Sequence, residues 1–200
     1  PVQRVEGEGE KVQVKVCGLM GGHSGAEIDK NRANANKLMG RFLYGLKKKA
    51  EYALISLTGG QKDNAITREC TAEFLTDSVA EVKAYAKELQ EQLREEYTGS
   101  DENITFEITE KGTATAEVLH PTSQEKIVFY LQNVPFGIQK MSGTIKGLVE
   151  TSSNIGILRL DRDELFASSS VRSSVDAACS ALSDKIEYLT EFLGGDYEVQ

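Results

Sequence analysis

The sequence has 200 residues, with 23 Lys and Arg against 31 Asp and Glu, so its formal net charge is −8. Hydrophobic residues make up 40% of the chain and charged residues 27%, which is typical of a globular protein and excludes a disordered one. The acidic balance argues against nucleic acid as a partner, because phosphate binding needs a basic surface. No apolar run is long enough to span a membrane. Three widely spaced cysteines form neither a disulfide framework nor a C-x-x-C motif, so we expect a cytoplasmic protein.

Hydrophobic spacing in the first half of the chain predicts the order strand, helix, strand, strand, helix, strand. The expected strands are 11–16, 53–58, 65–74 and 104–108, and the expected helices are 35–46 and about 78–93. Ser78 is the expected N-cap of the second helix. This order is that of a split βαβ, or ferredoxin-like, unit, in which helices form one layer on an antiparallel sheet.

The second half is predicted to repeat this order of elements without repeating the sequence. The expected strands are 113–118, 138–141, 145–160, 165–172 and 197–200, and the expected helices begin at 121 and 175. We therefore predict an α+β fold with two tandem ferredoxin-like (βαββαβ) halves, 1–112 and 113–200, in a single domain covering 1–200. No Pro- or Ser-rich linker separates the halves, which favours one continuous antiparallel sheet with the helices packed on one face.

The motifs of several hydrolases and nucleotide-binding proteins are missing. The only two histidines, His23 and His120, belong to no H-x-D, H-x-H or H-E-x-x-H motif. Because a catalytic zinc takes about three protein ligands, we expect no catalytic metal centre from this chain alone. The sequence has no G-x-S-x-G motif for a serine nucleophile. It also lacks the P-loop and G-x-G-x-x-G patterns that bind phosphates.

His23 lies in a run of small residues, Gly21-Gly22-His23-Ser24-Gly25, between a predicted strand and a predicted helix. Glycines allow positive φ angles and the close approach of a ligand or of another segment. A histidine in such a loop is displayed, and near neutral pH its imidazole can donate a hydrogen bond. On these residues alone, a functional histidine and a loop histidine without a task both remain open.

Four segments carry a resemblance to a known family. They follow the same order as in the family and, together with residues 34–43 (NANKLMGRFL), cover nearly the whole chain. The segments are 18–25 (GLMGGHSG), 59–69 (GGQKDNAITRE), 131–137 with 147–154 (LQNVPFG and GLVETSSN), and 170–176 (SVRSSVD). They resemble the lid, or dimerisation, domain of the aminoacyl-histidine dipeptidases, which are carnosinase-like members of the co-catalytic di-zinc metallopeptidases.

The resemblance implies that this chain is the lid of a zinc-dependent dipeptidase that hydrolyses the peptide bond of small dipeptides. The family's zinc ligands and catalytic glutamate lie in a catalytic domain formed by sequence before and after the lid. We therefore expect the zinc to bind outside this chain, and no cofactor within it. The expected partners are the chain's own catalytic domain and a dipeptide substrate. The isolated chain is expected to be inactive.

The resemblance also assigns site residues. His23 matches the lid histidine that donates a hydrogen bond to the substrate carbonyl and stabilises the oxyanion, and Arg172 matches an arginine suited to the free carboxylate. Asn64 matches an asparagine that contacts substrate near its carboxylate end, with Asn154 as its second-half counterpart. Thr67 replaces the family's usual proline. This change is expected to loosen the turn that carries Asn64.

Two questions stay open at this point. In relatives with a shorter lid, the lid histidine reaches the active site of the partner subunit, whereas a doubled lid can provide its residues within one chain. A homodimer formed through the lid is compatible with either arrangement. The alternative function is a stand-alone ferredoxin-like module for regulation or oligomerisation, because this fold serves many purposes.

Overall fold

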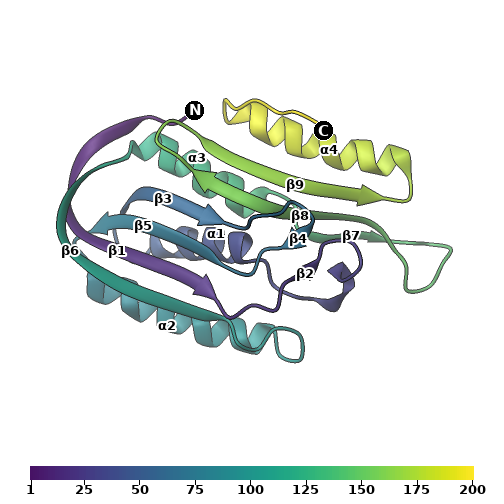
Figure 1. Ribbon diagram of the computed structural model, residues 1–200, viewed down its shortest axis with the longest axis horizontal. Helices are drawn as coiled ribbons and strands as arrows, with labels where there is room; N and C mark the ends of the chain where they lie inside the picture. Colours follow the sequence, from purple (N-terminus) through teal and green to yellow (C-terminus); the bar gives the residue numbers. More distant parts are fainter.

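The computed structural model describes all 200 residues, and its strands form one antiparallel sheet and a small separate two-stranded sheet (Figure 1). The sheet contains β1 (Arg4–Cys17), β3 (Ala53–Gly59), β5 (Cys70–Thr76), β6 (Thr105–Leu119), β7 (Gly137–Met141), β8 (Val149–Leu160) and β9 (Leu165–Ser173). The separate pair is β2 (Gly22–His23) with β4 (Ala65–Ile66). The helices are α1 (Ala35–Leu46), α2 (Val79–Glu96), α3 (Pro121–Asn133) and α4 (Asp176–Phe192), with a short 3₁₀ turn, η1, at Ile28–Lys30.

The first half of the chain has the predicted split βαβ arrangement. Its strands lie in the order β6-β1-β5-β3, so that β5 separates β1 from β3, the two strands that α1 connects. Every pairing is antiparallel. The outer parts of β1 and β6 continue beyond the rest of the sheet as a curved two-stranded ribbon (Figure 1).

The second half extends the same sheet, as predicted. β8 pairs with β3 through residues 158–160 and with β7 through its first residues, and β9 pairs along the other edge of β8. The strand expected at 113–118 is the end of β6, which crosses the proposed boundary between the halves and pairs with β1. The continuous sheet is confirmed, whereas a ferredoxin-like second half stays a prediction.

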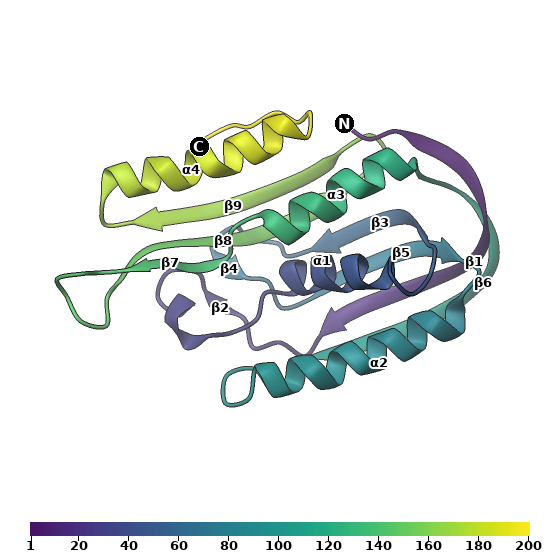
Figure 2. The same ribbon diagram turned by 180° about the vertical axis from the view of Figure 1, so that it is seen from behind.

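The helices cover one face of the sheet, which Figure 2 shows from the helical side. α1 lies at the centre, where its buried side chains include Phe42 and Leu43, and it packs on α3, α2 and the sheet. The Asn34 side chain caps α1 by accepting hydrogen bonds from the backbone of Asn36 and Lys37. The predicted α+β fold class is therefore confirmed. None of the helices is both long and apolar enough to cross a membrane.

Several element predictions were wrong in detail. The strand expected at 65–74 is interrupted at 67–69. Residues 145–148, expected to begin the strand 145–160, belong instead to the loop between β7 and β8. Ser78 stands at the N-cap of α2 but makes no side-chain cap; its backbone N–H donates to the hydroxyl of Thr76 instead. No strand forms at 197–200.

Candidate functional site

The loop that carries His23 is held against the loop after β3. β2 and β4 pair antiparallel, with His23 opposite Ala65, and the Ser24 N–H donates to the carbonyl of Asn64 at 2.9 Å. Two of the predicted site residues, His23 and Asn64, are therefore neighbours, and both are exposed. Both loops lie at the end of the sheet from which the β7–β8 hairpin projects (Figures 1 and 2).

The imidazole of His23 folds back onto its own loop. Its Nδ1 atom accepts hydrogen bonds from the backbone N–H groups of Gly25 and Ala26, each at 3.0 Å. A nitrogen that accepts from N–H groups carries no proton, so the proton of the neutral ring lies on Nε2. This second nitrogen makes no hydrogen bond within the chain and belongs to an exposed residue. The site therefore presents one N–H donor to solvent.

Arg172 meets His23 at Gly25. A Cβ atom placed on Gly25 would lie 3.1 Å from Nε of Arg172 and 3.2 Å from Cε1 of His23. The two side chains thus flank the same glycine, although 148 positions separate them in the sequence. Arg172 comes from β9, opposite Ser152 of β8. Its guanidinium is exposed and has no carboxylate partner within the chain.

Asn154 lies on β8 and is only 1% exposed. Its Nδ2 donates to the carbonyls of Asp63 (3.2 Å) and Ala65 (2.8 Å), on either side of Asn64, and its Oδ1 accepts from Asn34 at 3.0 Å. Both amide hydrogens and the oxygen are therefore engaged within the protein. The structure brings Asn154 under the Asn64 loop and not to the surface that His23 and Arg172 share.

The expectation that Thr67 loosens this turn was wrong. Thr67 is buried, and its hydroxyl lies 3.1 Å from the carbonyl oxygen of Ile155 and 3.2 Å from that of Gly156. The hydroxyl oxygen of Thr67 also accepts a hydrogen bond from the side-chain amide of Asn36 at 3.1 Å. A proline has no such hydroxyl, so threonine here adds a link between the loop and β8.

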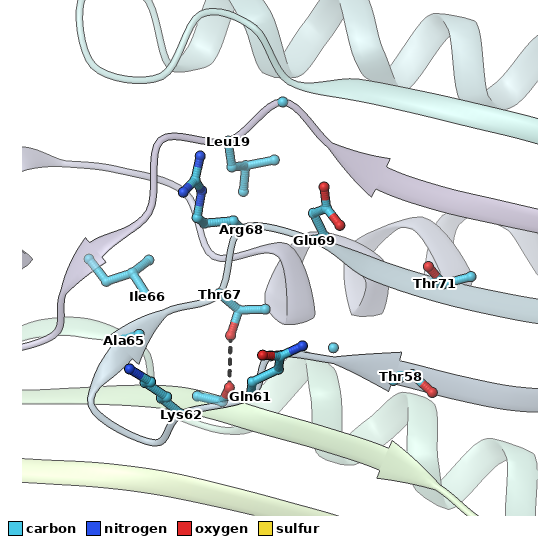
Figure 3. Close-up of a pocket in the computed structure, with 14 residues that line it drawn as sticks. Leu19, Thr58, Gln61, Lys62, Ala65, Ile66, Thr67, Arg68, Glu69 and Thr71 are labelled. Carbon is cyan, nitrogen blue, oxygen red and sulfur yellow. Dashed lines mark hydrogen bonds between the residues drawn. The ribbon is translucent and has the colours of Figure 1, made fainter.

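A groove of about 940 Å³ lies beside this loop, and Ala65 and Ile66 of β4 are among the residues that line it (Figure 3). Gln61 and Lys62 from the β3–β4 loop form one side of it, and Arg68 and Glu69 form the other. Glu69 pairs with Lys15 at 3.4 Å. Neither His23 nor Arg172 lines this groove, so the predicted site residues lie next to it and not inside it.

Other polar groups of the chain do not add chemistry to this end. No group of three or more His, Cys, Asp or Glu side chains could hold a metal ion, so the residues present do not fit a zinc site. Burial raises the pKa of the Cys70 thiol far above its ordinary value, which keeps the sulfur protonated and unreactive.

The sequence reasoning missed the buried amide network that fixes the site. Asn34 and Asn36, at the start of α1, both donate to the carbonyl of Ile155. Asn34, directly before α1, has the residue type of an N-cap, and Asn36 is the second residue of the helix. They carry no signal for a cross-link to a strand about 120 positions away.

Comparisons with known proteins relate this α+β domain to the dimerisation domains of peptidases. Residues 14–101 match the family model of the peptidase dimerisation domain. The chain is 30% identical over 193 residues to the cytosol non-specific dipeptidase of Escherichia coli (strain K12), a match that covers 96% of this chain and 40% of that protein. The structure superimposes on that of the aminoacylhistidine dipeptidase from Vibrio alginolyticus with a TM-score of 0.81 and 27% identity, over 96% of this chain and 43% of that one.

These matches confirm the resemblance drawn from the sequence. Residues 14–101 match a peptidase dimerisation domain, and the chain is homologous to both of these dipeptidases. It spans less than half the length of the relatives it matches.

Proposed function

We propose that residues 1–200 form a single lid domain that closes over the active site of a zinc-dependent dipeptidase and supplies side chains for peptide-bond hydrolysis. The observation that supports this best is the meeting of His23 and Arg172 at Gly25. It places one exposed N–H donor and one unpaired guanidinium on the same small surface of an otherwise acidic chain. That pair can bind a substrate that has both a carbonyl oxygen and a carboxylate, as a dipeptide does.

His23 is the proposed donor to the carbonyl oxygen of the scissile bond. As the carbon becomes tetrahedral, negative charge develops on this oxygen, and a positioned N–H group stabilises it more than it stabilises the ground state. The imidazole needs no change of protonation for this role, because Nε2 already carries the proton. The zinc ions and the catalytic glutamate of the reaction would lie outside residues 1–200.

Arg172 is the proposed partner of the free carboxylate of the substrate. A guanidinium offers two parallel N–H groups that match the two oxygens of a carboxylate, a geometry that an ammonium group lacks. Asn64 is proposed to contact the substrate next to this carboxylate, since it is exposed and lies beside the His23 loop. Asn154 is proposed to act indirectly, by holding the backbone on both sides of Asn64.

The wider assembly is also proposed. The partner of the lid is the catalytic domain of the same protein, and a homodimer formed through the lid is consistent with its membership of a dimerisation-domain family. A cytoplasmic location agrees with the name of the Escherichia coli relative.

The test uses a full-length protein that carries this chain, assayed on a dipeptide and on its C-terminal amide. His23→Ala is expected to lower kcat about 10²–10³-fold, the loss typical of one oxyanion donor. His120→Ala is the matched control, because it removes the other histidine, whose Nδ1 caps α3. Arg172→Lys is expected to raise KM for the free dipeptide and to leave KM for the amide unchanged. An unchanged kcat in His23→Ala would refute the proposed role.

A further inference from the structure

The His23 loop is braced by a glutamate and an arginine that belong to no role proposed so far. The backbone N–H of His23 donates to Oε2 of Glu27 at 2.7 Å, and the backbone N–H of Glu27 donates to the carbonyl of His23 at 3.0 Å. Residues 23 and 27 thus hold each other by two reciprocal hydrogen bonds. These bonds close the turn in which the N–H groups of Gly25 and Ala26 point at the imidazole.

Arg32 holds the other oxygen of the same carboxylate. Its Nη1 lies 3.0 Å from Oε1 of Glu27 and donates to the carbonyl of Gly21 at 2.8 Å. The side chain of Arg32 is only 17% exposed, whereas that of Glu27 is 38% exposed, so the ion pair is partly shielded from water. The hydrogen bond from the His23 backbone, followed by that from Arg32, lowers the pKa of Glu27. The carboxylate is therefore ionised at neutral pH and can accept both bonds.

We propose that Glu27, held by Arg32, is a positioning residue that fixes His23 as the Nε2–H tautomer and directs that N–H out of the loop. The carboxylate does not touch the imidazole. It acts through the backbone, because the turn that it closes places two N–H donors against Nδ1. A proton on Nδ1 would face these two donors, and the ring would have to leave the turn.

This inference rests on the proposed function for its purpose, since an oxyanion donor must carry its proton on the exposed nitrogen. The structural claim itself concerns only the tautomer. It can therefore be tested on the 200-residue chain without a substrate or the rest of an enzyme.

The experiment is a long-range ¹H–¹⁵N NMR correlation of the two imidazoles at a pH where both are neutral. The wild-type His23 is expected to show Nε2–H. In Glu27→Ala the ratio of Nε2–H to Nδ1–H is expected to fall about tenfold, the effect of one net hydrogen bond. Glu27→Gln keeps an acceptor oxygen and is expected to restore most of the ratio. Arg32→Met keeps Glu27 but removes the ion pair that holds its carboxylate, and this variant should also lower the ratio of Nε2–H to Nδ1–H.

Two controls separate this effect from a general loss of structure. His120 is an internal reference, because its Nδ1 accepts from Thr122 at 3.1 Å, and its signals should not change in any variant. Glu96→Ala removes an exposed ion pair with Arg41 on another part of the surface and should leave His23 unchanged. A wild-type His23 with its proton on Nδ1, or an unchanged ratio in Glu27→Ala, would overturn the proposal.

The same variants in a full-length protein distinguish this inference from the proposed function. Glu27→Ala is expected to lower kcat with little change in KM, and Glu27→Gln to recover most of it. If the tautomer ratio falls while kcat does not, the positioning role holds and the catalytic role of His23 fails. If the ratio does not fall, the positioning role fails whatever the activity.

Discussion

The loop that carries Asn64 lies in close backbone contact with β8, and the substitution Gly60→Ala is the most direct test of this contact. Gly60 has φ +78°, and a Cβ atom there would overlap the carbonyl oxygen of Gly156 on β8. Gly112 has nearly the same φ, +79°, but a Cβ atom there would meet nothing within 4 Å. The two glycines therefore share the conformational requirement and differ in the contact.

The expected destabilisation follows from these two contributions. A left-handed conformation costs an L-residue about 1–2 kcal/mol, so Gly112→Ala should lower the free energy of unfolding by about that amount. Gly60→Ala adds the displacement of a packed backbone, which costs about 1–3 kcal/mol more. For a chain of this size, that difference corresponds to a gap in Tm of about 2–12 °C. Since the overlap pushes the loop away from β8, the displacement also moves Asn64.

Urea unfolding followed by far-UV circular dichroism measures both variants against the wild type, and a thermal scan provides the Tm. In a full-length enzyme, Gly60→Ala should also raise KM, whereas Gly112→Ala should not. Equal losses of stability in the two variants would show that the contact with Gly156 does not hold the loop, and the positioning of Asn64 would need another explanation.

Two further substitutions probe buried polar groups. Asn154→Ala removes three hydrogen bonds and should lower the free energy of unfolding by about 2–4 kcal/mol. The control Asn133→Ala, at an exposed residue with one side-chain hydrogen bond, should lower it by less than about 1 kcal/mol. Similar decreases in the two variants, measured by urea unfolding, would contradict the positioning role of Asn154. Burial lowers the pKa of Lys37 from 10.5 to about 8. Between these two pH values the unfolded chain binds more protons than the folded chain, so the free energy of unfolding should rise with pH, by up to about 3 kcal/mol. Lys37→Met should lose this rise in unfolding free energy measured from pH 7.5 to 10, and an unchanged rise would refute the assignment.

The sequence predicted elements well where one face is buried, and poorly elsewhere. The valines at 12, 14 and 16 are fully buried, and their alternation indicated this part of β1. Residues 4–10 of the same strand pair with residues 113–119 of β6 in the curved ribbon, where only Gly9, Val118 and Leu119 are buried. No hydrophobic alternation is needed there, so none marks the strand.

α4 shows that helical spacing alone does not determine burial. Its apolar residues recur at helical spacing, yet only Leu182 and Ile186 are buried, and Val175, just before the helix, is 43% exposed. The helix packs on β9, the edge strand, so it meets the sheet along a narrow contact. Periodicity predicts which side chains share a face, but the width of the surface that covers them depends on the sheet topology.

The site depended on strand register more than on any motif. His23 was predicted from its glycine-rich loop and the family resemblance, and Arg172 from the resemblance alone. Their meeting at Gly25 requires that Arg172 pair with Ser152, and a slip of one residue in β9 would turn the guanidinium to the helical face. Asn154 was predicted to contact substrate as the counterpart of Asn64, because nothing in the sequence reveals that its amide bonds to the carbonyls of Asp63 and Ala65.

The origin of the two side chains bears on whether one chain suffices for the site. His23 follows β1 in the first half, whereas Arg172 belongs to the β8–β9 hairpin of the second half. A domain that lacked the second half would have no arginine beside Gly25 unless another molecule placed one there. In this chain, β8 pairs with β3 and carries β9 into place within the same sheet. Both side chains are thus presented by one copy, and dimerisation is not needed to bring them together.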